Sequence, residues 1–309
     1  MICKFKTQPA RLAADMFYGG TILKLIDGKV ISAGVKQRAA QRAAALRERG
    51  VEPCLAVIIV GDDFASRTYV NNKKKCCAEV GIRSLEYALP EQTTQEELLD
   101  LIAELNGNDS VHGILCQLPV PEHIDDKAII NAISPEKDVD AFHPENVGHI
   151  AIGDGELLPC TPAGIMEMLR FEGIDPAGKN SVVIGRSNIV GKPMAMLLIN
   201  SSSTVTVCNS RTADLPSVTR RADILVSAVG KAKFVTPDMV KDGAVVIDVG
   251  MNRDENGKRC GDVDFDAVKD KCSYITPVPG GVGLMTVAML MQNTITAAEK
   301  SVRAVTSDD

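Results

Sequence analysis

A serine, a tyrosine and a lysine are spaced so that a helix would carry all three on one face. Ser66, Tyr69 and Lys73 follow a β-branched run at 57–60 and a turn at 61–63 that contains glycine and aspartate. The run predicts a buried strand, and the turn predicts the start of a helix. Because side chains three and four positions apart share a helical face, we expect the three to meet beyond the carboxyl end of that strand, where open α/β sheets bind ligands.

The chemistry open to this face is proton transfer. A lysine beside a phenol in a crevice can lose part of its hydration, which lowers its pKa toward neutrality and suits it to exchange protons with a substrate. Most tyrosine–lysine pairs on helices are structural, with the ring packed and the amine in water. Residues 66–73 by themselves leave both interpretations open.

The composition excludes several classes of protein. The chain has 309 residues, 45% hydrophobic and 24% charged, which fits one large globular domain or two smaller ones. A net charge of -6 argues against a nucleic-acid-binding surface, and an aromatic content of 4% without tryptophan argues against base stacking. No apolar run approaches the roughly 20 residues of a membrane-spanning helix. We therefore expect no nucleic acid and no membrane as a partner.

Cysteines and histidines give no sign of a disulfide framework or a metal site. The nine cysteines are odd in number and form no C-x-x-C pair, so we interpret them as reduced thiols in a reducing compartment. The four histidines are scattered, and His143 and His149, six positions apart in a predicted loop, lack metal-ligand spacing. We expect a cytoplasmic protein without a bound metal.

Residues 1–20 differ from the rest of the chain. Lys4, Lys6 and Arg11 precede the first acidic residue, and two glycines close the segment. We expect a loosely docked N-terminal extension. The alternative is an organellar targeting segment, which would make the protein mitochondrial.

Strands and helices alternate after this extension. The pattern predicts strands at 54–60, 84–89 and 111–116 and helices at 30–49, 66–81, 93–106 and 125–133. Residues 134–162, rich in proline and glycine, are expected to form a long loop at a domain junction, and such loops are usually functional. The aspartates within 137–140 are either binding groups or loop caps.

A second alternating series follows this junction. It predicts helices at 163–171, 194–200 and 284–305 and strands at 181–184, 204–208, 224–228, 244–249 and 274–276. Alternation of this kind is typical of a mostly parallel sheet with right-handed crossovers. The fold class that we expect is therefore α/β.

The turn after the strand at 181–184 has the composition of a phosphate-binding loop. Gly185, Ser187 and Gly191 precede a predicted helix whose first turn contains Pro193. Glycine lets the backbone approach a pyrophosphate, and the start of a helix offers free N–H groups and a positive dipole. The spacing is not G-x-G-x-x-G, so it leaves a nucleotide site and a plain tight turn equally open.

The end of the next strand favours NADP over NAD. Sites of this design that bind NAD place an Asp or Glu there to bind the ribose hydroxyls. This chain has Ser210 and Arg211 instead, and Arg186 lies in the preceding turn. Two guanidinium groups and a hydroxyl suit a 2′-phosphate through charge-assisted hydrogen bonds. The alternative is that Arg211 forms a surface ion pair with Asp214.

Three further strand ends carry small residues that can approach a ligand closely. Val229 and Gly230 follow one strand and Gly250 follows another, and we expect them to wall the nicotinamide half of the cofactor site. The stretch at 277–283 follows the last strand and is rich in both glycine and proline. A purely structural turn rarely needs this density of the two residues, so we interpret the stretch as functional.

These segments together resemble the bifunctional methylenetetrahydrofolate dehydrogenase/methenyltetrahydrofolate cyclohydrolase family, over roughly residues 22–300. No single motif is specific, but six occur in the family's order and at its separations. They are V-G-D-D at 60–63 with A-S-x-x-Y-V-x-x-K at 65–73, G-I-L-C-Q-L-P at 113–119, K-D-V-D at 137–140 with F-H-P at 142–144 and N-V-G at 146–148, P-C-T-P at 159–162, G-R-S-N-I-V-G-K-P at 185–193 and P-V-P-G-G-V-G-L-M-T at 277–286.

The resemblance implies two α/β domains with a deep cleft between them. It assigns residues 21–158 and 285–309 to a catalytic domain that binds folate and residues 159–284 to a Rossmann-like NADP-binding domain. It also implies a homodimer paired through the cofactor domains. The implied substrates are one-carbon derivatives of tetrahydrofolate: NADP⁺ oxidises 5,10-methylenetetrahydrofolate to 5,10-methenyltetrahydrofolate, and water then opens the ring to give 10-formyltetrahydrofolate.

The resemblance also implies a role for each residue that matches a motif. Lys73 would be the central proton-transfer group, needed chiefly for the hydrolysis, and Gln117 would bond it and tune its protonation. Tyr69 would position the aminobenzoate ring, and Ser66 would support the same helical face. Asp140 would bind the amino edge of the pterin, where a carboxylate matches paired N–H donors.

Two larger sets of residues complete the implied site. Folate would also be bound by Leu118, Pro279, Gly280 and Gly283. The cofactor would be held by Thr161, Gly185, Arg186, Ser187, Ile189, Ser210, Arg211, Val229, Gly230 and Gly250. Neither set contains a metal ligand.

Four residues depart from the family's usual pattern. Phe64 and Leu284 stand where proline is usual, Ala141 stands where glycine is usual, and Cys116 stands where valine is usual. None of these positions carries a catalytic group. Because Ala141 and Leu284 flank the implied folate site, we hypothesise an altered affinity for folate. The chain lacks the several hundred residues of a fused formyltetrahydrofolate synthetase, so we expect no synthetase activity.

Three other functions fit parts of the pattern. A dehydrogenase without hydrolytic activity would not need Lys73 and Gln117. A shikimate-dehydrogenase-like enzyme shares the two-domain plan, but it needs its own lysine–aspartate pair and does not explain residues 277–283. A cofactor-sensing protein with a relict site is disfavoured because the implied catalytic side chains are intact.

Overall fold

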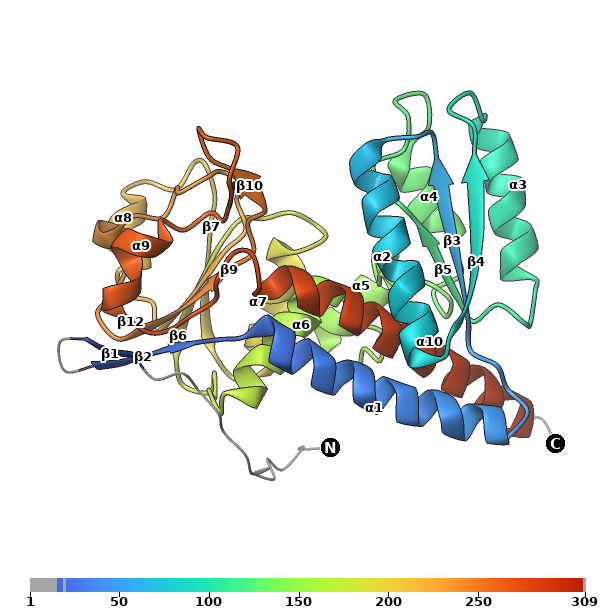
Figure 1. The fold of residues 1–309 in the computed structure, drawn as a ribbon, viewed down its shortest axis with the longest axis horizontal. Coiled ribbons are helices and arrows are strands. Elements are labelled where there is room, and N and C mark those ends of the chain that lie inside the picture. Colours follow the sequence, from blue (N-terminus) through green and yellow to red (C-terminus); the bar gives the residue numbers. More distant parts are fainter. Residues whose placement is uncertain (1–15, 19–20, 308–309) are drawn as a thin grey trace.

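Two main sheets with helices around them, and a small two-stranded hairpin, form the structure, a computed structural model that describes residues 16–18 and 21–307 (Figure 1). A three-stranded sheet lies at one end of the molecule and a seven-stranded sheet at the other, with long helices between them. The expected α/β class is confirmed. Most of the N-terminal segment, for which we expect an extension or a targeting function, lies outside the described residues.

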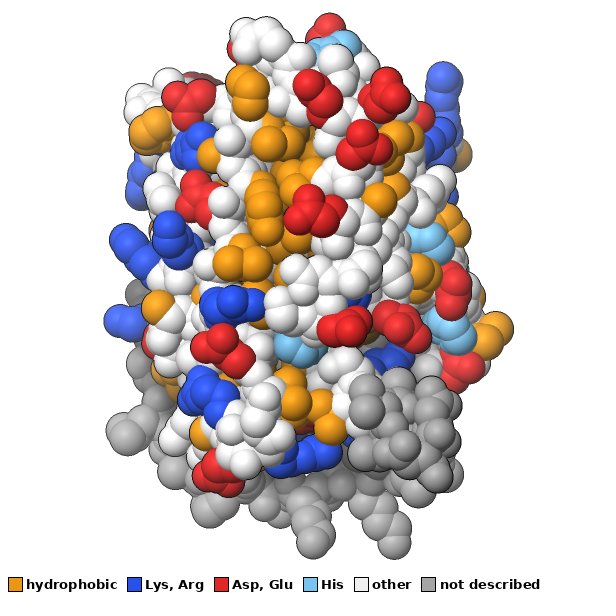
Figure 2. Space-filling view, turned by 90° about the vertical axis from the view of Figure 1, so that its right-hand side faces the viewer, with side chains coloured by type: hydrophobic (Ala, Val, Ile, Leu, Met, Phe, Trp, Pro, Cys, Tyr) orange, Lys and Arg blue, Asp and Glu red, His pale blue; other side chains and the backbone are white. Residues whose placement is uncertain are grey.

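The smaller sheet consists of three parallel strands in the order β4-β3-β5. They are β3 (Cys54–Val60), β4 (Arg83–Leu89) and β5 (Gly113–Cys116), and the helices of this unit are α2 (Phe64–Val80), α3 (Gln95–Asn106) and α4 (Asp126–Ala132). Successive residues of β3 belong to two different hydrophobic clusters, so both faces of the sheet are covered. Figure 2 looks onto this end of the molecule, where hydrophobic side chains gather in a strip between charged ones.

The larger sheet has the order β1-β2-β12-β9-β8-β6-β7. Its C-terminal strands lie within two residues of the predicted ones: β6 (Asn180–Ile184), β7 (Thr204–Cys208), β8 (Ile224–Ser227), β9 (Ala244–Asp248) and β12 (Cys272–Ile275). All of these pair in parallel. The helical segments around them are α6 (Cys160–Phe171), α7 (Gly191–Asn200), α8 (Leu215–Thr219), α9 (Phe265–Val268) and the 3₁₀ turns η1 (Pro237–Met239) and η2 (Lys269–Lys271).

Two N-terminal strands extend the larger sheet. β2 (Thr21–Leu25) lies parallel to β12, and β1 (Met16–Tyr18) lies antiparallel to β2. The sequence leads us to place residues 21–25 with the folate-binding domain and residues 1–20 outside both domains, whereas the structure joins both strands to the sheet of the cofactor unit. The N–H of Ile26 continues this pairing by donating to the carbonyl of Ile275 at 2.9 Å.

Long helices connect the two units. α1 (Gly28–Glu48) and α10 (Val282–Ser307) run side by side beneath the smaller sheet, and α10 also packs on α6 (Figure 1). One hydrophobic cluster includes Val57 of the small sheet and Val226 of the large sheet, so the core is continuous between them. Among the helices that the structure describes, none is long and apolar enough to cross a bilayer.

One helix contradicts the expected loop at 134–162. α5 (Pro144–Ile152) begins with proline after His143, whose Nδ1 accepts a hydrogen bond from the N–H of Glu145 at 3.2 Å. Gly153 ends the helix in the left-handed conformation, with φ 87°. Proline suits the first position of a helix and glycine its end, so the residues that suggest a loop are the boundaries of a short helix.

Candidate active site

Lys73 and Gln117 meet at the carboxyl end of the small sheet. α2 is capped by Asp63, whose carboxylate accepts a hydrogen bond from the N–H of Ser66 at 2.7 Å. Two turns further along, Nζ of Lys73 donates to Oε1 of Gln117 at 2.8 Å. Gln117 directly follows β5, and its N–H bonds the carbonyl of Ile58 on β3 at 2.8 Å. Two adjacent strand ends therefore hold this pair in place.

A second hydrogen bond orients the side chain of Gln117. Its Nε2 donates to the carbonyl of Leu118 at 2.8 Å. Because the NH₂ group is used in this bond, the amide oxygen faces the half-buried amine of Lys73. The pair predicted from the sequence is present, with the lysine as donor.

Asp140 lies within electrostatic range of the same amine. Burial raises the pKa of Asp140 to about 6, the positive charge of Lys73 opposes this rise, and the charge of Asp138 adds to it. Asp140 as a residue is half-buried, and it lines a cavity together with Cys116 and Leu118. A carboxylate and an amine thus lie near an apolar cavity at the strand ends.

The two aspartates of the K-D-V-D stretch have different surroundings. Asp138 is buried and accepts hydrogen bonds from the N–H of His143 at 2.7 Å and from Nδ2 of Asn146 at 3.0 Å. Asp138 therefore caps the loop, and it also lines the same cavity as Asp140. Ala141, between them and His143, has φ 57°, a left-handed conformation that costs a non-glycine residue roughly 1–2 kcal/mol and explains why glycine is usual there.

Tyr69 contacts the cofactor unit across the site. Its hydroxyl donates to Sδ of Met251 at 3.4 Å, and the ring is 39% exposed. A Cβ atom on Gly283 would lie 3.3 Å from the same sulfur. Met251 therefore lies between two residues for which we expect a role in folate binding. The sequence directs attention to the strand end at 248–252 but does not single out this methionine.

The loop at 277–283 packs against the start of α1. A Cβ atom on Gly28 would overlap the carbonyl oxygen of Gly281 and lie 2.7 Å from that of Gly280. Gly280 has φ 111°, and Pro279 is exposed. Close backbone approach accounts for the glycines, and α1 supports the loop from beneath.

Thr161 lies at the junction of the two units. Its Oγ1 is 2.9 Å from Oγ1 of Thr286 in the first turn of α10. The preceding residue, Cys160, has its sulfur 4.0 Å from Oδ1 of Asp140. The start of α6 thus touches both the start of α10, just after the loop at 277–283, and Asp140.

The turn between β6 and α7 is wound tightly around its glycines. Gly185 has φ 129°, and a Cβ atom there would overlap the carbonyl oxygen of Ala228. A Cβ atom on Gly191 would overlap the carbonyl oxygen of Gly185. Oγ of Ser187 accepts hydrogen bonds from the N–H groups of Val190 and Gly191 at 3.2 and 3.3 Å. This cradle fits a pyrophosphate, which needs close backbone approach at the start of a helix.

Four residues predicted to hold the cofactor are exposed: Arg186, Ile189, Ser210 and Arg211. All but Ile189 are predicted to bind the 2′-phosphate. The backbone of Arg211 is fixed because its N–H donates to Oδ1 of Asn209 at 2.9 Å. The ion pairs found within residues 16–18 and 21–307 include none between Arg211 and Asp214.

The predicted nicotinamide walls are held by two aspartates, Asp248 and Asp262, to which the sequence assigns no such role. The N–H of Val229 donates to Asp262 at 2.7 Å, and the N–H of Gly250 donates to Asp248 at 2.9 Å. Gly230, with φ 67°, directly follows Val229 in the same loop. Burial raises the pKa of Asp248 to about 6, and its N–H donors oppose this rise. Asp248 begins the strand end at 248–252 that the sequence singles out, whereas Asp262 lies in none of the stretches singled out, because only the fold brings it beneath the loops.

Two family models match the chain. The model of the tetrahydrofolate dehydrogenase/cyclohydrolase catalytic domain matches residues 26–140, and that of the tetrahydrofolate dehydrogenase/cyclohydrolase NAD(P)-binding domain matches residues 159–302. The chain belongs to the tetrahydrofolate dehydrogenase/cyclohydrolase family. The resemblance found in the sequence is confirmed.

Relatives of known sequence and structure match over most of the chain. The bifunctional protein FolD of Campylobacter hominis is 58% identical over 281 residues, which cover 91% of this chain and 99% of that protein. The crystal structure of the FolD methylenetetrahydrofolate dehydrogenase/cyclohydrolase of Campylobacter jejuni superposes with a TM-score of 0.88 at 53% identity, covering 90% of this chain and 99% of that one. The crystal structure of FolD of Trypanosoma brucei, solved with NADP and an inhibitor, superposes with a TM-score of 0.86 at 42% identity. The match covers 90% of this chain and 98% of that one.

Proposed function

We propose that this family member is a bifunctional enzyme that oxidises 5,10-methylenetetrahydrofolate with NADP⁺ and hydrolyses the 5,10-methenyltetrahydrofolate formed to 10-formyltetrahydrofolate. The observation that carries the proposal is the Lys73–Gln117 hydrogen bond beside Asp140, at the strand ends that face the cofactor unit. A dehydrogenase alone needs no such pair, because hydride transfer requires only that two rings lie close together in a dry site.

The oxidation depends on placing the substrate between the two units. Tyr69 and the loop at 277–283 would position the folate, with Asp140 accepting hydrogen bonds from the pterin's amino edge. NADP⁺, when bound, supplies the hydride acceptor. The turn at 185–191 would hold its pyrophosphate, and Arg186 and Arg211 would bind its 2′-phosphate.

The hydrolysis depends on moving protons at Lys73. The amine of Lys73 takes a proton from the water that attacks the one-carbon bridge of the methenyl cation, and a C–O bond forms. The bond between the bridge carbon and N5 then breaks while the new hydroxyl group loses its remaining proton and becomes the formyl C=O. N5 receives one proton, so 10-formyltetrahydrofolate is left with one net proton released. Gln117 holds the amine at the place where this exchange occurs.

The proposal extends to assembly and location. β7 ends the large sheet, and Val207 on it is 42% exposed, so this edge offers a surface through which two cofactor units can pair as a homodimer. The free state of the eight described cysteines is compatible with a cytoplasmic enzyme. NADP is the proposed cofactor in preference to NAD.

The test is an absorbance assay of the purified protein with 5,10-methylenetetrahydrofolate and either NADP⁺ or NAD⁺. We expect reduction of NADP⁺, no accumulation of the methenyl product, and enzyme-dependent loss of added methenyltetrahydrofolate. Reduction without hydrolysis would leave a dehydrogenase alone. A folded protein that reduces neither cofactor would refute the proposal, and shikimate would then be the next substrate to offer.

A further inference from the structure

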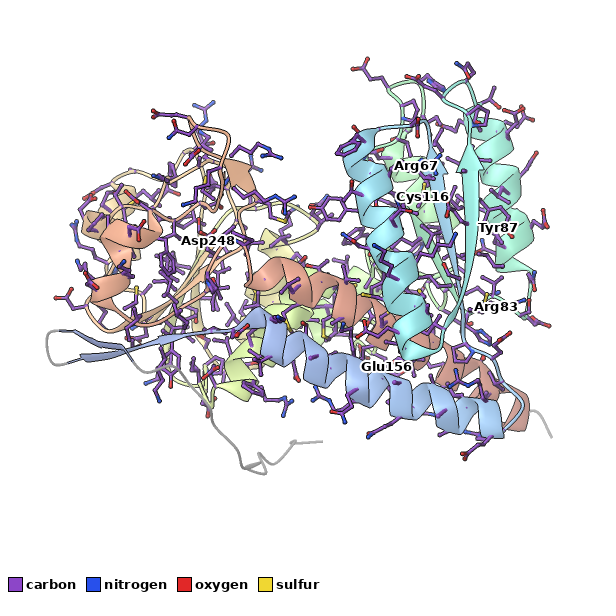
Figure 3. All side chains as sticks on the ribbon, viewed as in Figure 1. Arg67, Arg83, Tyr87, Cys116, Glu156 and Asp248 are labelled. Atoms are coloured by element: carbon purple, nitrogen blue, oxygen red, sulfur yellow. The ribbon has the colours of Figure 1, made fainter. Side chains whose placement is uncertain are left out.

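Two buried carboxylates lie beneath the loops at the carboxyl ends of β8 and β9. Asp248 is the last residue of β9, and Asp262 follows the hairpin of β10 (Asn252–Arg253) and β11 (Arg259–Cys260). They are 3% and 0% exposed, and Figure 3 labels Asp248 inside the unit of the large sheet. In the described part of the chain neither forms an ion pair with a lysine, arginine or histidine side chain.

Asp262 accepts four hydrogen bonds from two different loops. Its Oδ2 accepts from Oγ of Ser227 at 3.2 Å and from the N–H of Val229 at 2.7 Å. Its Oδ1 accepts from the N–H of Lys231 at 3.0 Å and from Nδ2 of Asn252 at 2.9 Å. Oδ2 therefore bonds only to the end of β8 and the loop after it, and Oδ1 joins that loop to the segment after β9.

Asp248 fixes the position of Asp262 in turn. It accepts hydrogen bonds from the N–H groups of Asp262 and Val263 at 2.8 and 2.9 Å, in addition to that of Gly250. The packing here leaves no room for side chains, because Cβ atoms on Gly250 and Gly261 would overlap the carboxylates of Asp262 and Asp248. The two aspartates and the two loops form one rigid arrangement.

The loops do not need the carboxylate of Asp262 to stay attached to the fold. Backbone hydrogen bonds hold the segment that follows Lys231. The N–H of Lys233 donates to the carbonyl of Gly261 at 3.1 Å, and the N–H of Val235 donates to the backbone carbonyl of Asp262 at 2.9 Å. The carboxylate instead sets how the tip at Val229 lies relative to Gly250. These are the two walls assigned to the nicotinamide.

We propose that Asp262 is a positioning residue for hydride transfer, which holds the loops after β8 and β9 at the spacing that the nicotinamide ring requires. This inference rests on the proposed function. It concerns the oxidation alone, because Lys73, Gln117 and Asp140 lie in the other unit. Small displacements of reacting groups cost on the order of 100-fold in rate, so the expected effect is large and confined to one activity.

The experiment compares Asp262→Asn with the wild type in both assays. Asparagine has the same shape, but its NH₂ group faces a backbone N–H donor, that of Val229 or of Lys231, whichever way the amide is turned, so at least one of the four hydrogen bonds is lost. We expect the dehydrogenase kcat to fall about 10- to 100-fold, with a smaller change in the KM for NADP⁺, while the cyclohydrolase rate stays within twofold. The control is Asp264→Asn, which removes a nearby charge from a half-buried side chain that stands at the N-cap of α9 but makes no capping hydrogen bond there. It should leave both rates unchanged.

Several outcomes would overturn the inference. A dehydrogenase rate within twofold of the wild type would do so, as would a parallel loss of both activities together with a lower Tm, which marks a merely structural role. If Asp262→Asn does not fold, Ser227→Ala is measured in its place, because it removes only the 3.2 Å hydrogen bond from Oγ of Ser227 to Asp262. A loss of about threefold in the dehydrogenase rate would then support the role of Asp262, and no loss would refute it. A wild-type protein that does not reduce NADP⁺ would instead refute the proposed function itself.

Discussion

Nζ of Lys73 lies 2.8 Å from Oε1 of Gln117, although 44 positions separate the two residues in the chain. They meet because β3 and β5 pair in parallel with Ile58 opposite Cys116. Lys73 on α2, the helix after β3, therefore reaches Gln117, the residue after β5. A shift in this register would move Gln117 out of reach of the amine. The proposed proton transfer therefore depends on the pairing of two strands.

Lys73→Ala should abolish the cyclohydrolase and leave a folded protein. The alanine suits a helix and removes the only group to which we assign proton transfer. Lys75→Ala is the control, because Lys75 is an exposed lysine on the same helix. The measurement is the rate of loss of added methenyltetrahydrofolate, with circular dichroism to check the fold. Hydrolysis at the wild-type rate in Lys73→Ala would contradict the assigned role.

Arg211→Ala should weaken the binding of NADP much more than that of NAD. A charge-assisted hydrogen bond contributes about 1.5–3 kcal/mol, so we expect the KM for NADP⁺ to rise roughly 10- to 100-fold. The KM for NAD⁺ should change little, since it lacks the 2′-phosphate. Arg221→Ala is the control, because this exposed arginine precedes β8 and so lies near the amino end of that strand, whereas Arg211 follows the carboxyl end of β7. An equal effect on both cofactors would argue against recognition of the 2′-phosphate.

Folate affinity should fall as the pH is lowered through about 6. Burial raises the pKa of Asp140 to about 6, so its carboxylate is ionised above this pH and protonated below it. The ionised carboxylate has two acceptor oxygens and no donor, so it matches the pterin's N–H donors, whereas the protonated form carries an O–H group of its own. The Kd of tetrahydrofolate, measured at a series of pH values on both sides of 6, should rise on the acidic side. In Asp140→Asn this transition should be absent, and its persistence would assign it to another group.

Gly28→Ala should damage the folate site from outside it. The added methyl group would overlap the carbonyl oxygen of Gly281, so the loop at 277–283 must move. Overpacking of this kind costs about 1–3 kcal/mol. We expect a lower Tm and a higher KM for methylenetetrahydrofolate.

Gly34→Ala is the matched control for this prediction. It lies on the same helix, and the nearest atom to its added Cβ is NH1 of Arg38 at 3.7 Å. The substitution should raise stability by up to about 1 kcal/mol, because alanine favours a helix more than glycine does. If both variants lose folate affinity equally, the contact between Gly28 and the loop is not the cause.

The sequence predicts most of the elements in this structure because their signals are local. The strand β3 and the capped start of α3 follow from hydrophobic runs and from the residues at their ends. α5 is missed because Pro144 and Gly153 are read as loop residues, although they are suited to the two ends of a helix. The sequence does not predict β2, because this strand of five residues gains its stability from pairing with β12, which is distant in the chain.

The sequence by itself determined the alternation of strands and helices, the family, and the residues whose chemistry is distinctive, Lys73 and Asp140 among them. It could do so because periodicity, caps and motif spacing are written along the chain. Only the tertiary structure decided that Met251 contacts Tyr69 and that Asp262 joins two loops. Neither residue differs locally from others of its type. Their positions depend on contacts between distant segments, and these form only when the two sheets and their loops have packed.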